Sequence, residues 1–142
     1  MGFTNQAGSD LSGRVSWLQS AQPAARTYPA GFALPDGLQA VGALYSFAKG
    51  VPLVSLPNGG VVLLENGNLA QRILYAFSID AQNHVSGANG LNVRLSPGSG
   101  LFSGQVLEPG THRRLAFRGA LLQKQNAGYG YFVGDGDRKS VV

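Results

Sequence analysis

Apolar residues recur at every second position in short segments along most of the chain. The clearest segment is 91–96 (LNVRLS), in which an apolar residue precedes a polar one three times in succession. Because the side chains of a strand point to alternate faces, this period of two predicts strands with one buried face. The pattern predicts strands at 11–18, 41–47, 51–56, 60–65, 69–80, 91–96, 100–107, 113–123 and 128–133. The start of 69–80 also fits a helix, but the alternation from Ile73 to Ile79 favours a strand.

Asn-Gly and Asp-Gly pairs interrupt the apolar segments. They occur at Asn58-Gly59, Asn66-Gly67, Asn89-Gly90, Asp36-Gly37 and Asp135-Gly136. These pairs tolerate a positive φ at low cost and therefore suit the tight turns of β-hairpins. We predict one hairpin of 51–56 with 60–65 and another of 100–107 with 113–123. The predicted fold class is all-β: an antiparallel β-sandwich or barrel of about eight strands.

The segment 19–40 departs from this pattern. It contains three prolines, each of which lacks the N–H group that a strand ladder uses. We therefore predict a long irregular connection between the strands at 11–18 and 41–47. Tyr28 lies within this connection.

The composition fits one globular domain. The chain has 142 residues, of which 44% are hydrophobic, and its mean hydropathy is +0.01. Only 13% of the residues are charged, well under the usual quarter. A surface so poor in charge is common in secreted β-proteins that meet neutral polymers. We expect residues 1–142 to form a single all-β accessory domain excised from a longer secreted protein, an expectation with which the opening Met is compatible. The first residues do not have the pattern of a signal peptide. We expect no membrane partner, since no run approaches the ~20 apolar residues of a membrane span.

The positive charge is thinly spread along the sequence. The chain carries 11 basic and 7 acidic residues, which gives a formal net charge of +4. The only local cluster is Arg113, Arg114 and Arg118, and a strand places Arg113 on the face opposite to the other two. A nucleic-acid site needs more charges than this, so we expect a solvated strand face and no nucleic-acid partner. The absence of cysteine excludes disulfides, thiolate metal sites and a cysteine nucleophile.

The C-terminal third contains the most specific motifs of the sequence. They are 99–104 (SGLFSG), 108–111 (EPGT), 117–119 (FRG) and 122–132 (LQKQNAGYGYF). Together with 11–17 (LSGRVSW) and 28–32 (YPAGF), they resemble a β-domain found at the C-terminal end of large secreted multidomain proteins of environmental bacteria. The resemblance covers most of the chain, implies an extracellular accessory module and brings no catalytic residues with it. Where that family has a neutral Thr-Asn-Gln-Ser-type loop, this chain has 135–139 (DGDRK).

The same C-terminal motifs have a structural interpretation. Gly119, Gly128 and Gly130 predict bulges or a close approach of neighbouring backbone within strands. Gln123 and Asn126 follow a predicted strand, where side-chain amides can satisfy the backbone groups of a turn. For these two amides, a structural role therefore competes with ligand binding.

The residues that enzymes use are not grouped in this sequence. There is no G-x-S-x-G, phosphate-loop or H-E-x-x-H motif, and neither His84 nor His112 has a second ligand at metal-binding spacing. The seven acids are scattered, and none forms an evident pair for glycosidase chemistry. We therefore expect a non-catalytic protein without a cofactor. Asp135 and Asp137 are a candidate Ca²⁺ site, because two nearby carboxylates can bind calcium, although such pairs are also common in ordinary turns.

Aromatic side chains are the best candidates for ligand binding. Sugar rings present apolar C–H faces that stack on aromatic rings, while their hydroxyls bond to amide and charged groups. Tyr129 and Tyr131 point the same way from one strand and would form a two-ring platform, unless they pack against a neighbouring sheet. Arg118, Gln123 and Asn126 lie near them in the sequence and supply hydrogen-bond donors.

Two further aromatic residues complete the set of candidates. Tyr28 lies in the proline-rich segment, where it would be exposed. Trp17 is the only tryptophan, and it shares a strand face with Leu11 and Val15, which favours a core position over a binding role.

We therefore predict a secreted, non-catalytic carbohydrate-binding module whose partner is a polysaccharide, a β-glucan or another plant or microbial glycan. One alternative is a structural or cell-surface attachment domain, in which Tyr28, Tyr129 and Tyr131 are buried. A second alternative is a small glycan-active hydrolase. Open sheet edges can pair between chains, so we expect a monomer or a weak dimer.

Overall fold

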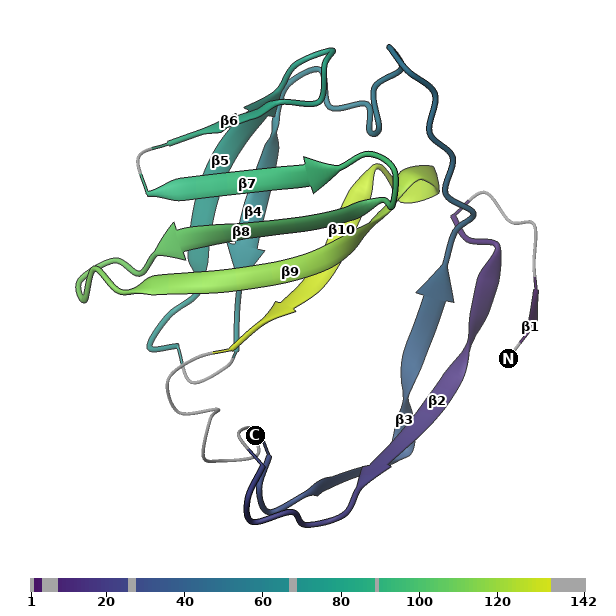
Figure 1. The fold of residues 1–142 in the computed structure, drawn as a ribbon, viewed down its shortest axis with the longest axis vertical. Helices are drawn as coiled ribbons and strands as arrows, with labels where there is room; N and C mark the ends of the chain where they lie inside the picture. Colours follow the sequence, from purple (N-terminus) through teal and green to yellow (C-terminus); the bar gives the residue numbers. More distant parts are fainter. Residues whose placement is uncertain (1, 4–7, 26–27, 67–68, 89, 134–142) are drawn as a thin grey trace.

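Antiparallel β-strands make up almost all of the regular structure (Figure 1). The computed structural model describes residues 2–3, 8–25, 28–66, 69–88 and 90–133. The strands are β1 (Gly2–Phe3), β2 (Leu11–Gln19), β3 (Phe32–Gly42), β4 (Gly60–Leu64), β5 (Ile73–Ile79), β6 (Val85–Gly87), β7 (Leu91–Ser96), β8 (Leu101–Leu107), β9 (Arg114–Leu122) and β10 (Ala127–Phe132). A single turn of 3-10 helix, η1 (Gln123–Gln125), lies between β9 and β10. The all-β prediction is confirmed.

The strands form three sheets. β1, β2 and β3 form the first, β4, β5 and β6 the second, and β7, β8, β9 and β10 the third, each in that order. We refer to β2 and β3 as the arm and to β4–β10 as the body. Strands that pair in the body also follow one another in the chain, because short connections suffice for antiparallel neighbours. The arm extends away from the body (Figure 1).

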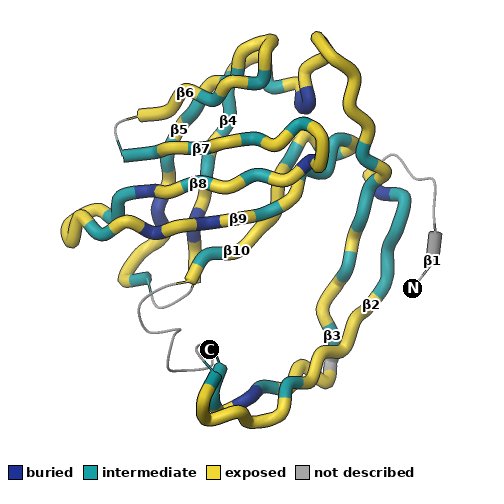
Figure 2. Tube along the Cα trace, viewed as in Figure 1, coloured by how far each residue is buried: buried dark blue, intermediate teal, exposed yellow. Residues whose placement is uncertain are grey.

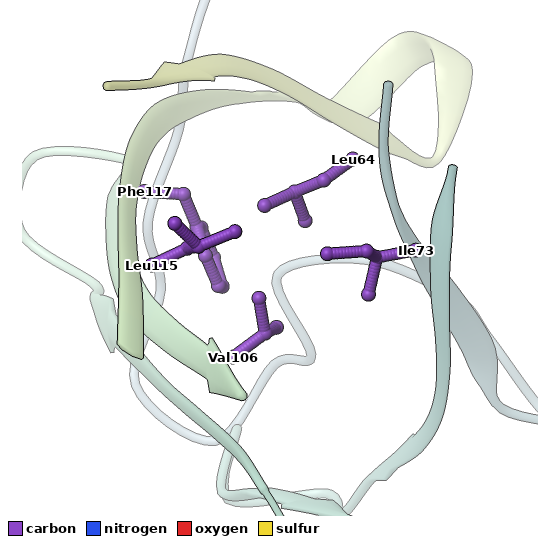
Figure 3. Packing of buried hydrophobic residues seen from close by; sticks show 5 residues of the cluster. All are labelled: Leu64, Ile73, Val106, Leu115 and Phe117. Atoms are coloured by element: carbon purple, nitrogen blue, oxygen red, sulfur yellow. The ribbon is translucent and has the colours of Figure 1, made fainter. Parts of the chain in front are cut away.

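The two sheets of the body face each other as an open sandwich. Leu64 and Ile73 from the three-stranded sheet meet Val106, Leu115 and Phe117 from the four-stranded sheet (Figure 3). All five side chains are buried, and they form the core. In the described part of the chain the strands do not close into a barrel, since β4 and β10 are each paired on one side only. Of the two predicted architectures, the sandwich is the one observed.

The four-stranded sheet follows the alternation of its sequence closely. The strands predicted at 91–96, 100–107, 113–123 and 128–133 are observed, with bounds that differ by at most one residue. The predicted hairpin between β8 and β9 is also observed, and Gly110 in its turn has a φ of +89°. Residues at alternate positions are exposed on the outside of the sheet (Figure 2). The buried or half-buried positions of each strand face the core.

Glycines in the strands of the body make room for phenylalanine rings. Phe102 pairs across the ladder with Gly119, and Phe117 pairs with Gly104. A Cβ at position 119 would lie 2.3 Å from Cζ of Phe102, and a Cβ at position 104 would lie 2.3 Å from Cζ of Phe117. The ring of Phe102 reaches one strand further, to within 2.7 Å of the Cβ position of Gly128. Each ring therefore covers bare glycine backbone, an arrangement that stabilises glycine within a sheet.

The close approach of neighbouring backbone is confirmed for Gly119 and Gly130, whereas the atoms nearest to the Cβ position of Gly128 are those of the Phe102 ring. A Cβ at Gly130 would lie 2.0 Å from the carbonyl oxygen of Arg118 on the neighbouring strand. The ladders of β8, β9 and β10 run without a shift in register, so the alternative of a bulge is not observed there. The three-stranded sheet uses the same device, because the ring of Phe77 occupies the Cβ position of Gly60, its ladder partner.

We predicted an irregular connection at 19–40, and this prediction is wrong for the second half of the segment. Phe32–Gly42 forms β3, which pairs with β2 along the arm. Pro35 fits because the ladder shifts register here and residues 35–37 have no partner on β2. Gly37 adopts a φ of +74° within this irregularity, so the Asp-Gly pair bends a strand instead of joining two strands.

The predictions of strands at 41–47 and 51–56 are wrong as well. β3 ends at Gly42, and residues 43–59 reach β4 without forming a strand. β4 pairs with β5 rather than with 51–56. Leu53 and Val54 of this connection are buried, and the hydroxyl of Tyr45 donates a hydrogen bond to the carbonyl oxygen of Pro97. Burial raises the pKa of Tyr45, as expected for a phenol held against the body.

Replacing Gly119 by alanine should destabilise the protein. The new Cβ would lie 2.3 Å from both the Phe102 ring and the carbonyl oxygen of Tyr129. Overpacking of this kind lowers the free energy of unfolding by about 1–3 kcal/mol, which urea denaturation followed by circular dichroism would measure. Gly98→Ala is the matched control, because nothing lies within 4 Å of its Cβ position. Equal stability of the two variants would contradict this role of the ring.

Candidate functional site

The outer face of the four-stranded sheet carries the two tyrosines predicted to form a platform. Tyr129 and Tyr131 lie on β10, and 61% and 64% of their surface is exposed. Being two residues apart on a strand, they share one face. The glycines on either side of Tyr129 face inward, where Phe102 covers Gly128. The structural alternative predicts that Tyr28, Tyr129 and Tyr131 are buried; Tyr129 and Tyr131 are exposed, whereas Tyr28 is half-buried.

The strand register determines which side chains lie beside the tyrosines. Tyr131 is the ladder partner of Arg118, and Arg118 is the partner of Ser103 on β8. Ser103 is in turn the partner of Arg94 on β7. These four exposed residues form one line across the sheet, which we call the arginine row. The adjacent rows consist of Tyr129, Ala120, Leu101 and Ser96 on one side, and of Ala116, Gln105 and Asn92 on the other.

Sequence reasoning identified Arg118 on this face but missed Arg94, Ser103 and Gln105. The alternation of 91–96 already placed Arg94 on the outside of its strand. Its position relative to Arg118 depends on the strand order and on the register of two ladders. Neither quantity is encoded in the spacing of residues within one strand.

The outer face is positively charged. Arg94, Arg114 and Arg118 point outward and are exposed, and no outward-facing residue of β7–β10 is acidic. Arg113 has the opposite orientation, as predicted, and its Nε lies 3.0 Å from Oε2 of Glu108 in the turn. The described face thus combines two aromatic rings, guanidinium groups and neutral hydrogen-bonding side chains.

The amides of Gln123 and Asn126 bond to the protein backbone. Oε1 of Gln123 accepts a hydrogen bond from the N–H of Ser46 at 2.9 Å, and its Nε2 donates to the carbonyl oxygens of Ser46 and Leu53 at 3.0 and 3.1 Å. Oδ1 of Asn126 accepts from the N–H of Ser55 at 2.9 Å. The interpretation that these side-chain amides satisfy backbone groups is therefore confirmed. The backbone groups that they satisfy belong to the connection 43–59 and not to the turn that carries the amides. We call residues 123–126 the clamp turn.

The clamp turn also holds the base of the arm. Lys124 forms an ion pair with Asp10, whose other oxygen accepts a hydrogen bond from the N–H of Leu44 at 2.7 Å. Nε2 of Gln125 donates to the carbonyl oxygen of Gly8 at 2.9 Å. The hydrogen bond from Lys124, followed by that from Leu44, holds the pKa of Asp10 below its usual value of 3.8. One turn of the body thus holds the start of β2 and the end of β3, which are paired at the base of the arm.

The other predicted aromatic residues lie on the arm. Trp17 is 56% exposed and contacts Phe32 edge to face, with 5.4 Å between ring centroids. Tyr28 is half-buried against the same ring, at 5.1 Å. The core position predicted for Trp17 is wrong, because this part of the arm does not pack against the body. These three rings form a separate cluster and are not brought together with Tyr129.

A hollow of about 630 Å³ lies between the two sheets of the body. Its walls are mainly apolar side chains, among them Val62, Leu64, Val93 and Phe102. Both edge strands, β4 and β10, border it. Tyr129, Tyr131 and Arg118 of β9 and β10 also border this hollow at its edge. A sugar needs donors and acceptors around its hydroxyls, so the apolar interior between the sheets is less suited to a carbohydrate than the outer face.

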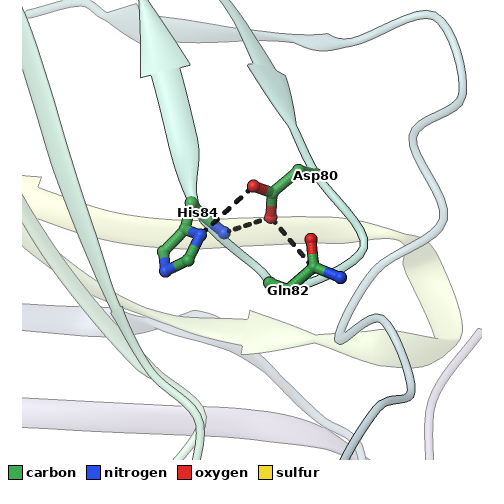
Figure 4. A network of polar contacts seen from close by, with 3 residues as sticks. All are labelled: Asp80, Gln82 and His84. Carbon is green, nitrogen blue, oxygen red and sulfur yellow. Dashed lines mark hydrogen bonds and ion pairs between the residues drawn. The ribbon is translucent and has the colours of Figure 1, made fainter.

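The remaining polar cluster stabilises a turn. Oδ1 of Asp80 accepts hydrogen bonds from the N–H groups of Gln82 and His84 at 2.9 and 2.8 Å, and Oδ2 lies 3.2 Å from Nδ1 of His84 (Figure 4). These contacts, above all the backbone N–H of His84, lower the pKa of Asp80. Within the described residues, no three His, Cys, Asp or Glu side chains are grouped to hold a metal ion. The predicted calcium ligands Asp135 and Asp137 lie outside the described residues.

Comparisons with protein-family models, with curated proteins and with solved structures yield no match for this chain. The described residues contain no helix of the length and apolarity needed to cross a membrane. The functional argument therefore depends on the chemistry and geometry of the faces described above.

Replacing Gln123 by alanine should release the connection 43–59. Three hydrogen bonds to its backbone would be lost, which should lower the free energy of unfolding by about 1–3 kcal/mol. Hydrogen exchange of the Ser46 amide should accelerate, because its partner is removed. Gln71→Ala is the control, since Gln71 is exposed. Unchanged exchange at Ser46 would show that the amide contact is dispensable.

Acidification should weaken the base of the arm through Asp10. Because the pKa of Asp10 is lowered in the folded state, its carboxylate stabilises the protein above pH 3.8, and this contribution is lost as the pH falls through the folded-state pKa. Asp10→Asn should therefore be less stable than the parent at pH 7. The difference should shrink below pH 3.8 in thermal melts recorded from pH 7 to 2. A difference that stays constant over this range would contradict the ion pair.

Proposed function

We propose that this protein is a non-catalytic, extracellular carbohydrate-binding module, and that a polysaccharide lies along the outer face of β9 and β10. The observation that carries the proposal is the pair of exposed rings of Tyr129 and Tyr131 on a regular strand. Solvent-exposed aromatic rings are costly to hydrate and gain free energy when an apolar surface covers them. The C–H faces of sugar rings offer such a surface.

The rigidity of the strand favours this use of the rings. Tyr129 and Tyr131 are held by β10, whose whole length pairs with β9. A tyrosine has few rotatable bonds, so it loses little conformational entropy when a ligand covers it. Two such rings in fixed positions suit a linear polymer that repeats the same unit.

Polar groups for the sugar hydroxyls lie next to the rings. Arg118 is the ladder partner of Tyr131, and Ser103 follows on β8. Gln105 lies in the adjacent row. These side chains supply both donors and acceptors.

The proposed extracellular setting has support in composition and sequence. The chain has few charged residues and no cysteine. Its motifs at 99–104 and 122–132 resemble those of domains at the ends of large secreted proteins. We therefore propose an accessory role, in which this module keeps a larger protein in contact with its polysaccharide.

Binding should be lost when the two rings are removed. The measurement is a pull-down of the purified protein on insoluble cellulose, xylan, chitin and mannan, with affinity gels for soluble glucans. We expect retention on at least one polymer, and an interaction weaker by about fivefold or more for Tyr129→Ala and for Tyr131→Ala. A flat ring stacked on an aromatic side chain contributes about 1–3 kcal/mol, and each step of about 1.4 kcal/mol is a factor of ten.

Phe47→Ala is the matched control for this experiment. Phe47 is an exposed aromatic residue in the connection 43–59 and belongs to neither β9 nor β10. The control should bind like the parent protein. Retention that survives both tyrosine substitutions but is lost on Trp17→Ala would place the binding site on the arm and refute the proposed face.

A further inference from the structure

We infer that the polysaccharide bound on the outer face is acidic, and that the arginine row binds the carboxylates of its uronic-acid units. This inference rests on the proposed function and adds the chemical class of the ligand. It starts from the pairing of Arg94 with Ser103, and of Ser103 with Arg118, across three adjacent strands.

The register fixes the spacing of the backbone positions from which the two guanidinium groups project. Neighbouring strands of a sheet lie about 4.8 Å apart, so the backbones at Arg94 and Arg118 are separated by about 10 Å, with Ser103 between them. Both side chains leave the same face of the sheet and are exposed. They therefore offer two separate positive positions along one line, which suits charges that are spaced along a polymer.

Among the described residues, no carboxylate projects from the outer face of β7–β10 to neutralise these arginines. The carboxylates of Asp10, Asp80 and Glu108 each have a basic partner elsewhere in the structure. The outward-facing residues of β7–β10 in the described chain are neutral apart from the arginines. Arg114 adds a third positive charge on the same face, four residues before Arg118.

The chemistry of arginine matches a carboxylate. A guanidinium group binds a carboxylate with two parallel hydrogen bonds and stays charged at all physiological pH values. At the end of the same row, Tyr131 can stack on the ring of the sugar that carries the charge. A neutral glycan would use the tyrosines but would leave both guanidinium groups without an ionic partner.

A nucleic acid is less suited to this face. Its binding requires many phosphate contacts, usually from a dense basic surface. Here the described face has three arginines and no lysine among its outward-facing residues, and its flanking rows are neutral. We therefore favour a polymer with fewer, more widely spaced charges and with sugar rings that cover the tyrosines.

The test is isothermal titration calorimetry with polygalacturonate and with its methyl-esterified form, in 0.15 M NaCl. The ester keeps the sugar backbone and removes the charge. We expect the acidic form to bind at least tenfold more tightly, and the double variant Arg94→Gln/Arg118→Gln to lose at least tenfold in affinity, because bonds to charged groups are among the strongest. Arg72→Gln, which removes an exposed charge outside the four-stranded sheet, should bind within twofold of the parent. Unchanged melting temperatures establish that the variants are folded.

Several results would overturn the inference. Equal affinity for both forms of the polymer, sensitive to Tyr131→Ala but not to the arginine substitutions, would refute an acidic ligand and leave the proposed function intact. An equal loss of affinity in Arg72→Gln would indicate attraction to net charge alone. Displacement of polygalacturonate by inorganic polyphosphate or by duplex DNA at equal charge concentration would indicate a general polyanion site. Failure to bind these polymers and all of the neutral glycans would refute both proposals.

Discussion

The contact between phenylalanine rings and bare glycine backbone is the constraint on which the rest of the body depends. Phe102 occupies the side-chain space of Gly119 and Gly128, and Phe117 occupies that of Gly104. Only glycine leaves room for a ring at these positions, so the ladders of β8, β9 and β10 have a single register in which rings and glycines coincide. The same contacts bring β8, β9 and β10 together over the core.

The functional face follows from this register. With Gly128 turned toward Phe102, the alternation of the strand turns Tyr129 and Tyr131 to the solvent. The same ladders align Arg118 with Arg94 on the outside of the sheet. The clamp turn joins this sheet to the connection 43–59 through the amides of Gln123 and Asn126, and to the base of the arm through Lys124 and Gln125.

The sequence predicted the elements that depend on local pattern and failed where distant contacts decide. The strict alternation of 91–96 and the turn at 108–110 were sufficient for β7, β8 and β9. β3 was missed because Pro35 argues against a strand, whereas the observed ladder leaves residues 35–37 unpaired. Trp17 was expected in the core because its strand face is apolar, but the arm carries that face away from the body. The contact of Gln123 with Ser46 joins segments 77 residues apart, which no local pattern encodes.

The most direct test of the account is a ¹H–¹⁵N NMR titration of the labelled protein with oligogalacturonides. The account predicts that the amide shifts change for the residues of β9 and β10 around Tyr129 and Tyr131, and along the arginine row through Ser103 to Arg94. The resonances of Trp17 on the arm, and of Val62 beside the hollow, should stay in place. Changes centred on the arm, or on Val62, Leu64 and Val93 between the sheets, would contradict the claim that the outer face of the four-stranded sheet is the binding surface. No changes at all would contradict the claim that its ligand is acidic.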